Sequence, residues 1–485
     1  MITPEISWLS IGPDLVLAVA AALVLLVEVQ WKPPVRRLGW VVAGALIVAG
    51  GLTVLQWFAT ADAAAVNDFS SLTAFSGMIV TDGFAIFGRF ALLATTGLGV
   101  AAGWHFFRDL GRRGAEGLAL VLLATAGFSI MIASNNLVML FLGLEVGSIA
   151  LYVLAGLTRE DRRADEAAIK YFLMGSFASA IFIYGVALIY AGTRQLTIVG
   201  LGDFLNTFLV NSPAVILIGI ALVVIGLGFK VSAAPFHTWA PDVYQGAPAG
   251  IVGYMAAVAK IAGFAAIARI LLTGVEEMDS AFLPAISAIA VLSMLRGWIL
   301  AREHSDVRRM LAYSGVAHAG FIMTGVVGFS SSSVLFYLAV YAVQLVGAFA
   351  VVSAVSGPSG SSSDISMYRG LSRRSPVLAG SLTVLLLGMA GLPLTSGFVA
   401  KFGVFADAWS NGFEWLVVVA VLASVIAFAF YLRIIVIMYM EDDESEEIEV
   451  AGVVRWVLGI AVVATLLWGI LPSSLLDIAA DAFPL

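Results

Sequence analysis

About fourteen apolar stretches, each of roughly 20 residues, follow one another along the chain with short polar loops between them. A stretch of this length crosses the hydrocarbon core of a bilayer as a helix. Within that core, only helices and closed barrels satisfy the backbone hydrogen bonds. The sequence therefore predicts an all-α polytopic membrane protein. The expected spans are 12–31, 38–58, 79–103, 115–133, 138–157, 167–191, 213–235, 249–273, 281–300, 308–329, 333–356, 376–409 (interrupted), 414–440 and 452–472.

The composition supports this class and excludes several others. The 485 residues are 61% hydrophobic and 12% charged, whereas soluble domains contain about 25% charged residues. Cysteine is absent, which excludes thiolate-bound iron–sulfur clusters, cysteine-ligated zinc and disulfides. A net charge of −7 without a basic tail does not indicate a nucleic-acid partner. The first apolar run, near Asp14, lacks a small-residue cleavage site and is expected to be a membrane helix.

Basic residues are distributed unevenly over the loops. Loops after odd-numbered spans hold fifteen of the 25 lysines and arginines, whereas Arg194 alone lies in a loop after an even-numbered span. Basic loops favour the cytoplasmic side, so both termini are expected outside. The acidic run 441–449 follows span 13, but acidic residues weigh little in this rule. The fifteen are Lys32, Arg36, Arg37, Arg108, Arg112, Arg113, Arg159, Arg162, Arg163, Arg302, Arg308, Arg309, Arg369, Arg373 and Arg374.

Nine further basic residues lie in or near the expected spans. Arg89 and Arg433 can each pair with a nearby carboxylate or a backbone carbonyl. Four others lie near span ends, where a long cationic side chain can anchor a helix by reaching the interface. These four are Lys170, Arg269, Arg296 and Arg455.

The remaining three, Lys230, Lys260 and Lys401, are harder to explain as anchors. A lysine at the centre of a bilayer costs about 3 kcal/mol on insertion scales. Glu145 is the only acidic residue expected deep in a span of the first half, and one carboxylate cannot neutralise three ammonium groups. Burial disfavours the charged form of a lysine, so these side chains are expected to be neutral part of the time. Such a row favours a proton relay over a structural ion pair.

Helix-breaking residues lie beside two of these lysines. Pro235 follows Lys230 in GFKVSAAPFHTWAPDVYQGAP (228–248), and Pro393 precedes Lys401. A broken membrane helix is tolerated only where its freed backbone groups line a cavity or pack in protein. Paired breaks in two halves indicate inverted repeats. We therefore expect two inverted five-helix repeats, each with one broken helix, and four segments: 1–110 with spans 1–3, 111–275 with spans 4–8, 276–445 with spans 9–13, and 446–485 with span 14.

Five segments spread over nearly the whole chain resemble the antiporter-like subunits of respiratory complex I and of multisubunit cation/proton antiporters. Lysine at 401, FYLRIIVIMYMEDDE (430–444) and the lack of a long carboxy-terminal lateral helix make the subunit 2 group the most similar. The five segments are LGLEVGSIALYVLAG (142–156), 228–248, AVAKIAGFAA (257–266), DVRRMLAYSGVAHAG (306–320) and GLPLTSGFVAKF (391–402).

The resemblance implies roles for the matching residues. Glu145 would bias Lys230, which takes up a proton. Lys260 would pass the proton on, and Lys401 would release it outward. His318 occupies a position where the family places polar linkers. His237 would either support the break after Lys230 or simply cap that break.

The resemblance also implies a function and partners. The leading hypothesis is a proton-translocating membrane subunit of NADH:quinone oxidoreductase, within a hetero-oligomer of membrane subunits in the inner membrane of a bacterium. The chain is expected to bind no cofactor, since GLGVAAG (97–103) lies inside an apolar helix. NADH, FMN, iron–sulfur clusters and quinone are expected on partner subunits. The alternatives are a subunit of a multisubunit Na⁺/H⁺ antiporter, and a structural scaffold, which would leave three buried lysines unexplained.

Overall fold

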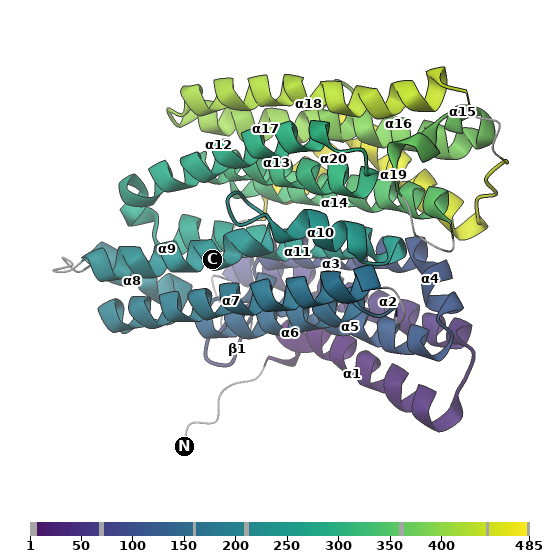
Figure 1. The fold of residues 1–485 in the computed structure, drawn as a ribbon. Coiled ribbons are helices and arrows are strands. Elements are labelled where there is room, and N and C mark those ends of the chain that lie inside the picture. The colour runs from purple at the N-terminus through teal and green to yellow at the C-terminus, as the bar shows by residue number, and fades with distance from the viewer. Residues whose placement is uncertain are drawn as a thin grey trace.

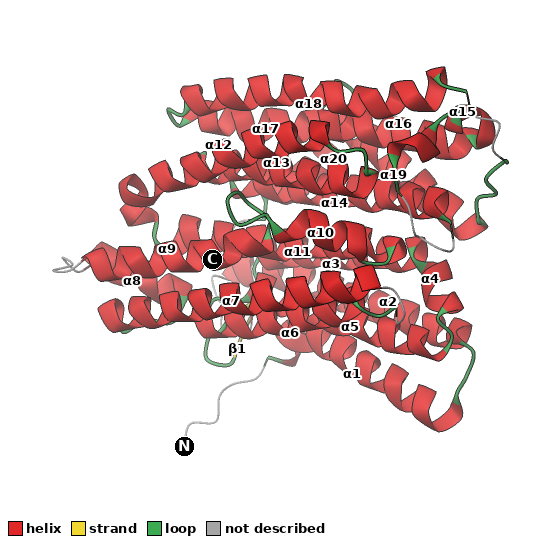
Figure 2. Ribbon diagram, in the orientation of Figure 1, coloured by secondary structure: helices red, strands yellow, loops and turns green. Residues whose placement is uncertain are grey.

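Long helices that lie side by side, with their axes roughly parallel, form almost the whole structure (Figures 1 and 2). The computed structural model describes residues 7–66, 72–158, 162–207, 213–357, 363–442 and 446–482. Arg159, one of the fifteen basic loop residues, and part of the acidic run 441–449 lie outside the described residues. The expected all-α polytopic class is confirmed.

The first half of the structure consists of helices and one short pair of strands. The amino-terminal part comprises α1 (Trp8–Trp31), α2 (Val35–Val66), the short antiparallel strands β1 (Thr73–Ala74) and β2 (Ile79–Val80), α3 (Gly83–Ala102) and α4 (Trp104–Asp109). The part that follows comprises α5 (Arg112–Ala133), α6 (Leu137–Ala155), α7 (Arg162–Thr193), α8 (Ile198–Thr207), α9 (Pro213–Lys230), α10 (Trp239–Gly246) and α11 (Ala249–Arg269), with a π turn at Ile270–Gly274 and a 3-10 turn at Glu276–Met278.

The second half also contains long helices and one helix break. It comprises α12 (Asp279–Glu303), α13 (Val307–Val327), α14 (Ser331–Ser356), a 3-10 turn at Ile365–Tyr368, α15 (Leu371–Arg374), α16 (Pro376–Ala390), α17 (Ser396–Ser410), α18 (Glu414–Met440), α19 (Gly452–Ile470) and α20 (Ser473–Ala480).

The expected spans correspond closely to these helices. Among the described residues, thirteen helices are long and apolar enough to cross a membrane. The remaining expected span, 376–409, is the pair α16 and α17, which is interrupted as its Gly-Pro segment predicts. The sequence did not predict α8, α20 or the β1–β2 hairpin. These elements are short, and α8 and α20 lie beyond the ends of the apolar runs.

Three helices form the buried centre of the chain. Essentially all of α11, α13 and α14 is covered by other helices, whereas less than a third of the most apolar window of α2 or α19 is buried. Small residues let α11 pack closely: a Cβ added at Gly253 would lie 2.9 Å from the Cβ of Phe349 on α14. Polar side chains on these three helices are therefore shielded from lipid by protein.

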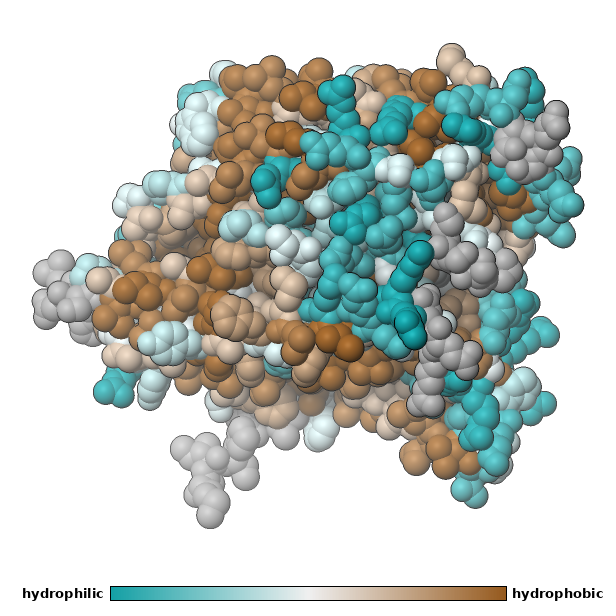
Figure 3. Space-filling view, in the orientation of Figure 1, coloured by the Kyte–Doolittle hydropathy of each residue, from teal (hydrophilic) through white to brown (hydrophobic). Residues whose placement is uncertain are grey.

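The two ends of the bundle differ in charge. Basic side chains of several loops and helix ends meet at one end, which we call the basic end. Arg108, Arg163 and Arg308 line one cavity there, and α4 and α15 lie at this end on the right of Figure 1. Figure 3 shows hydrophilic residues gathered there and over α10, with apolar side chains covering much of the rest of the visible face.

Candidate functional site

Lys230 is the last residue of α9, at the first helix break. The break is a loop of residues 231–238 that contains Pro235, whose ring cannot continue the helix. The Lys230 ammonium donates hydrogen bonds to Ser148 Oγ at 2.8 Å and to Tyr171 Oη at 3.3 Å. Its Nζ also lies 5.1 to 5.7 Å from the ring centroids of Phe128, Tyr152 and Tyr171. An aromatic cage of this kind stabilises a desolvated cation.

Lys260 lies in the middle of α11, and its side chain contacts the same helix break. Its Nζ donates to the carbonyl oxygen of Val231 at 2.7 Å and to that of Gly315 on α13 at 3.0 Å. Val231 is the first residue after Lys230, so the broken helix provides the carbonyl that holds Lys260. The close approach depends on Gly263, where a Cβ would lie 2.5 Å from Val231 Cγ1.

Lys401 lies on α17, shortly after the second break. Its Nζ donates to the carbonyl oxygen of Ala390 at 2.8 Å and to Ser424 Oγ at 2.7 Å, and lies 4.6 Å from the ring centroid of Phe321. Ala390 is the last residue of α16, and Gly391 then turns the chain with φ of +87°. Carbonyl groups at both breaks therefore accept hydrogen bonds from buried lysines, as expected for freed backbone groups.

Glu145 lies on α6 and is only partly buried, on a face where Leu142 and Ile149 are exposed. Its carboxylate accepts a hydrogen bond from the Ser179 hydroxyl. Among the described residues, no ion pair joins Glu145 to a lysine. A cavity of about 10 Å³, lined by Ser148, Ser179 and Lys230 among others, lies near them. This volume is close to that needed for one water molecule, and the lining offers polar partners.

The two candidate histidines have different surroundings. His318 on α13 is buried, with Nδ1 2.7 Å from Tyr337 Oη and Nε2 3.2 Å from Tyr431 Oη. His237 lies in the loop of the first break, with its ring 6.3 Å from that of Tyr313. The side chain of Thr238, the N-cap residue of α10, makes no capping hydrogen bond. Both roles considered for His237 stay predictions.

Two arginines are also buried, and each has a carboxylate. Arg89 on α3 donates from Nη2 to Asp14 Oδ2 at 2.7 Å, and also contacts Gln56 and Ser129. Its pairing with a carboxylate confirms one of the two roles expected for it. Asp14 is itself almost fully buried, so the expectation that Glu145 is the only deep acidic residue of the first half is wrong. The reason is that α1 begins at Trp8, earlier than the expected span, and carries Asp14 into the bundle.

Arg269 also differs from the sequence expectation. It does not reach the interface, because Asp82 at the N-cap of α3 receives its guanidinium through bonds of 2.6 and 2.9 Å. The other three expected anchors have exposed or half-exposed side chains: Lys170, Arg296 and Arg455. Lys170 forms ion pairs with Glu166 and Asp242. Arg433 donates to backbone carbonyls at Arg302 and His304, which confirms the carbonyl alternative.

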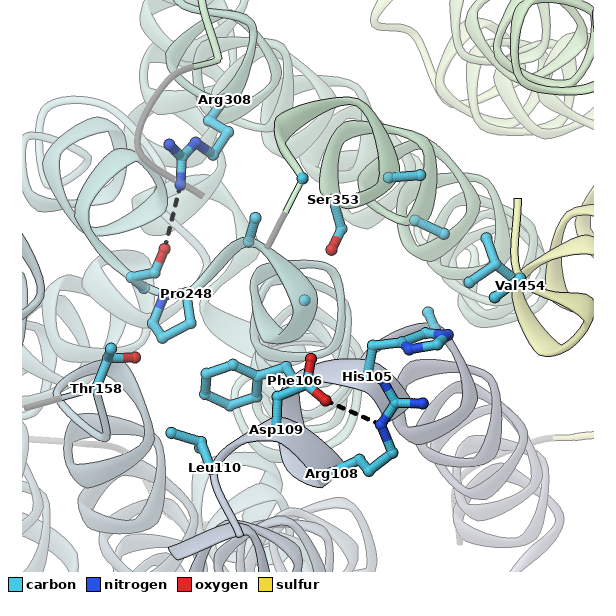
Figure 4. A pocket seen from close by; sticks show the side chains of 18 of the residues that line it. His105, Phe106, Arg108, Asp109, Leu110, Thr158, Pro248, Arg308, Ser353 and Val454 are labelled. Atoms are coloured by element: carbon cyan, nitrogen blue, oxygen red, sulfur yellow. Dashed lines mark hydrogen bonds and ion pairs between the residues drawn. The ribbon is translucent and has the colours of Figure 1, made fainter. Parts of the chain in front are cut away.

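A cavity of about 430 Å³ lies at the basic end, away from the buried lysines. It is lined by residues from α4, the loop before α11, α14 and α19. Figure 4 shows Arg108 bonded to Asp109 at one side of the cavity and Arg308 bonded to a backbone carbonyl at the opposite side. None of the predicted relay residues lines it. We therefore place the candidate site along the lysines instead.

The structure adds polar residues that sequence analysis missed. Ser148, Ser179 and Ser424 contact a relay residue directly, as do Tyr171, Tyr337 and Tyr431. A local signal existed for Ser148, which lies three residues after Glu145 and on a neighbouring part of the same helix face. The others are far from their partners in sequence. Among the described residues, no group of His, Cys, Asp or Glu side chains could hold a metal ion.

The fold and the site define a class of protein: a polytopic membrane protein with two broken helices whose breaks contact buried lysines. The sequence profile of the transmembrane NADH:quinone oxidoreductase/Mrp antiporter family matches residues 134–427. This match covers more than half of the chain, and the chain therefore belongs to this family.

Individual relatives agree with this assignment. NADH-quinone oxidoreductase subunit N of Mycobacterium tuberculosis is 44% identical over 77% of this chain and 73% of its own length. A chain of respiratory complex I from Thermus thermophilus, solved with bound aureothin, has a TM-score of 0.82 and 29% identity, and the match covers 97% of this chain and all 100% of that one. A chain of the Mrp complex from Dietzia sp. has a TM-score of 0.80 at 20% identity, covering 98% and 97% of the two chains, and is similar in fold alone.

Proposed function

We propose that this chain is the proton-translocating membrane subunit of an NADH:quinone oxidoreductase, and that protons move along its buried lysines. Family membership and the relatives named subunit N support the proposal. The observation that carries the relay is that Lys230, Lys260 and Lys401 are at most 4% exposed, yet none forms an ion pair with a described carboxylate. A lysine in such a place can exist in either protonation state, as a proton carrier must.

The order of transfer follows the contacts. Glu145 biases Lys230 through Ser179, Ser148 and the water-sized cavity between them. Lys230 and Lys260 are linked through one peptide, because Lys260 binds the carbonyl of Val231. His318 lies within electrostatic reach of both Lys260 and Lys401. Lys401 releases the proton at the far side.

Redox chemistry is assigned to partner subunits. In this proposal NADH, FMN, iron–sulfur clusters and quinone bind there, and the complex lies in the inner membrane of a bacterium. The chain acts as a translocase that receives its energy through contacts with neighbouring membrane subunits in the hetero-oligomer. Glu145 on α6 is only partly buried, so its carboxylate can respond to a conformational change in such a neighbour.

The proposal is tested in the intact complex, in membrane vesicles, by measuring NADH oxidation and proton movement together. Lys260→Ala should lower the number of protons moved per NADH while leaving NADH oxidation measurable. Lys170→Ala is the matched control, because Lys170 is a half-exposed lysine at the basic end with two carboxylate partners. A normal proton-to-NADH ratio in Lys260→Ala would contradict the relay.

We also propose that the basic end faces the cytoplasm, that both termini lie outside, and that segments 111–275 and 276–445 are inverted repeats. The cysteine-free sequence makes orientation simple to measure. Lys32→Cys at the basic end and Glu277→Cys at the other end both replace exposed residues. We expect an impermeant thiol reagent to label them from opposite sides, with Lys32→Cys accessible from the cytoplasm. Labelling from one side only would contradict the placement of the two ends on opposite sides of the membrane.

A second candidate function is a subunit of a multisubunit Na⁺/H⁺ antiporter, because a chain of an Mrp complex shares the fold. The same vesicles distinguish the two functions. A sodium gradient imposed without NADH should move no protons if the chain serves the oxidoreductase. Proton movement that depends on this chain and on the sodium gradient would favour the antiporter.

A further inference from the structure

Four polar side chains from three helices form one hydrogen-bonded chain in the centre of the protein. The hydroxyls of Ser314 on α13 and Tyr431 on α18 contact each other. Tyr431 Oη lies 3.2 Å from His318 Nε2, and His318 Nδ1 lies 2.7 Å from Tyr337 Oη on α14. All four side chains belong to residues that are at most 2% exposed. The order of contacts is Ser314, Tyr431, His318, Tyr337.

Each member of this chain can both donate and accept a proton. A hydroxyl carries one proton and has free lone pairs, and a neutral imidazole donates from one ring nitrogen while it accepts at the other. The two tautomers of His318 therefore correspond to two opposite directions of hydrogen-bond donation along the four side chains. In one direction the Tyr431 hydroxyl donates to Nε2, and in the other Nε2 donates to the Tyr431 oxygen.

This hydrogen-bonded row of side chains lies between Lys260 and Lys401, two of the predicted carriers. Ser314 precedes Gly315, whose carbonyl oxygen accepts a hydrogen bond from Lys260. Phe321, one turn after His318 on α13, contacts the His318 ring at a centroid distance of 5.8 Å and also lies against the Lys401 ammonium. The segment Ser314–Phe321 of α13 thus connects the surroundings of Lys260 with those of Lys401.

We propose that Tyr431 is a proton-carrying residue of the relay, which transfers protons between the Lys260 side and His318. The proposal rests on the relay function described above. A proton given up by the Lys260 ammonium reaches the Ser314 hydroxyl, which releases its own proton to Tyr431 Oη. The Tyr431 proton then passes to His318 Nε2, the Nδ1 proton passes to Tyr337 Oη, and the Tyr337 proton leaves toward the neutral amine of Lys401. Each hydroxyl keeps one proton and His318 changes tautomer, so no charge is left in the buried chain.

The structure provides a matched control in Tyr341. Its ring stacks on His318 at a centroid distance of 4.3 Å, and it lies on α14 one turn from Tyr337. It is as deeply buried as Tyr337, but among the described residues its hydroxyl has no hydrogen-bond partner. Tyr341→Phe and Tyr431→Phe therefore remove the same atom from the same ring type, and the first breaks no link of the chain.

The experiment measures protons moved per NADH oxidised in the intact complex, for four forms: wild type, Lys260→Ala, Tyr431→Phe and Tyr341→Phe. We expect Tyr431→Phe to lower the ratio as far as Lys260→Ala does, and Tyr341→Phe to match wild type. If Lys260→Ala lowers the ratio and Tyr431→Phe does not, Tyr431 is not a carrier although the relay stands. If Lys260→Ala has no effect, the proposed function itself fails.

A second measurement separates carrying a proton from merely holding His318 in place. Replacing Tyr431 with a ring-fluorinated tyrosine keeps the hydroxyl and its two hydrogen bonds but makes the phenol more acidic. The groups that face Tyr431 stay the same: Ser314 and His318 from α13, Tyr337 and Tyr341 from α14, and Trp298 from α12. A carrier should shift the pH dependence of proton movement, whereas an unchanged pH profile would assign Tyr431 a structural role only.

Discussion

The arginines buried beside α3 and the lysines buried along the centre of the protein are all desolvated cations, but they have different kinds of partner. Arg89 and Arg269 are as deeply buried as the three lysines, and each contacts a carboxylate directly. The lysines instead contact carbonyls, hydroxyls and aromatic rings. Arginine stays protonated in proteins, whereas a desolvated lysine can lose its proton. The comparison fits arginines that join helices through ion pairs, and it supports the proposal that the lysines carry protons.

The largest expected effect comes from breaking an arginine pair. Arg269→Ala removes the guanidinium that pairs with the buried Asp82 carboxylate, and removal of one member of a buried ion pair costs about 3–5 kcal/mol. We expect little assembled complex in the membrane, measured by native electrophoresis and thermal unfolding. The control is the double variant Arg269→Met with Asp82→Asn, which removes both charges and keeps a side chain able to cap α3. If the double variant is no more stable than Arg269→Ala, the unpaired charge is not the cause.

Lys401 should respond in the opposite manner, with assembly kept and proton movement lost. Lys401→Ala removes a buried cation that has no described carboxylate partner, so the complex should still assemble. Lys401→Arg keeps the positive charge but cannot release a proton at working pH. We therefore expect both variants to lower the proton-to-NADH ratio equally in vesicles. Recovery of the wild-type ratio by arginine would mean that Lys401 serves only as a fixed charge.

The sequence was informative about the lysines and less so about the arginines. Length and hydropathy of the apolar runs predicted the spans, and Pro and Gly beside Lys230 and Lys401 predicted both breaks, because these are local properties of the chain. The partner of Arg269 is 187 residues away along the chain, and no local pattern indicates such a pair. The expected span 12–31 placed Asp14 near one end, whereas α1 begins at Trp8 and Asp14 is buried.

The contacts of the site also depended on tertiary structure. That Lys260 would bind the carbonyl of Val231 follows from the packing of α11 on the first break through Gly263, which the sequence alone does not specify. Tyr431 lies 113 residues from His318 and entered the sequence analysis only as part of the segment 430–444. Local chemistry indicated candidate residues, and packing decides which of them are in contact.

Glu145 should show an intermediate effect, because it acts on Lys230 through other groups. Glu145→Gln removes the charge and keeps a side chain that can bond to Ser179. We expect assembly to be retained and the proton-to-NADH ratio to fall, by less than in Lys401→Ala, since Lys230 keeps its aromatic cage and both hydroxyl contacts. Asp242→Asn is a matched control: this carboxylate lies at the basic end and pairs with Lys170 and Arg309. Equal losses in both variants would show that any charge removal disturbs the complex.

The smallest expected effect separates two serines that each accept a hydrogen bond from a relay lysine. Ser148 bonds to Lys230, which has a further hydroxyl and three rings around it, whereas Ser424 bonds to Lys401, which has a carbonyl and one ring. A hydrogen bond to a charged group contributes about 1.5–3 kcal/mol, and the better surrounded cation loses the smaller part of its stabilisation. Ser424→Ala should therefore slow proton movement more than Ser148→Ala, with NADH oxidation as the internal reference. A larger loss in Ser148→Ala would instead show that Ser148 links Glu145 to Lys230, since Ser148 and Ser179, which bonds to Glu145, both line the water-sized cavity beside Lys230.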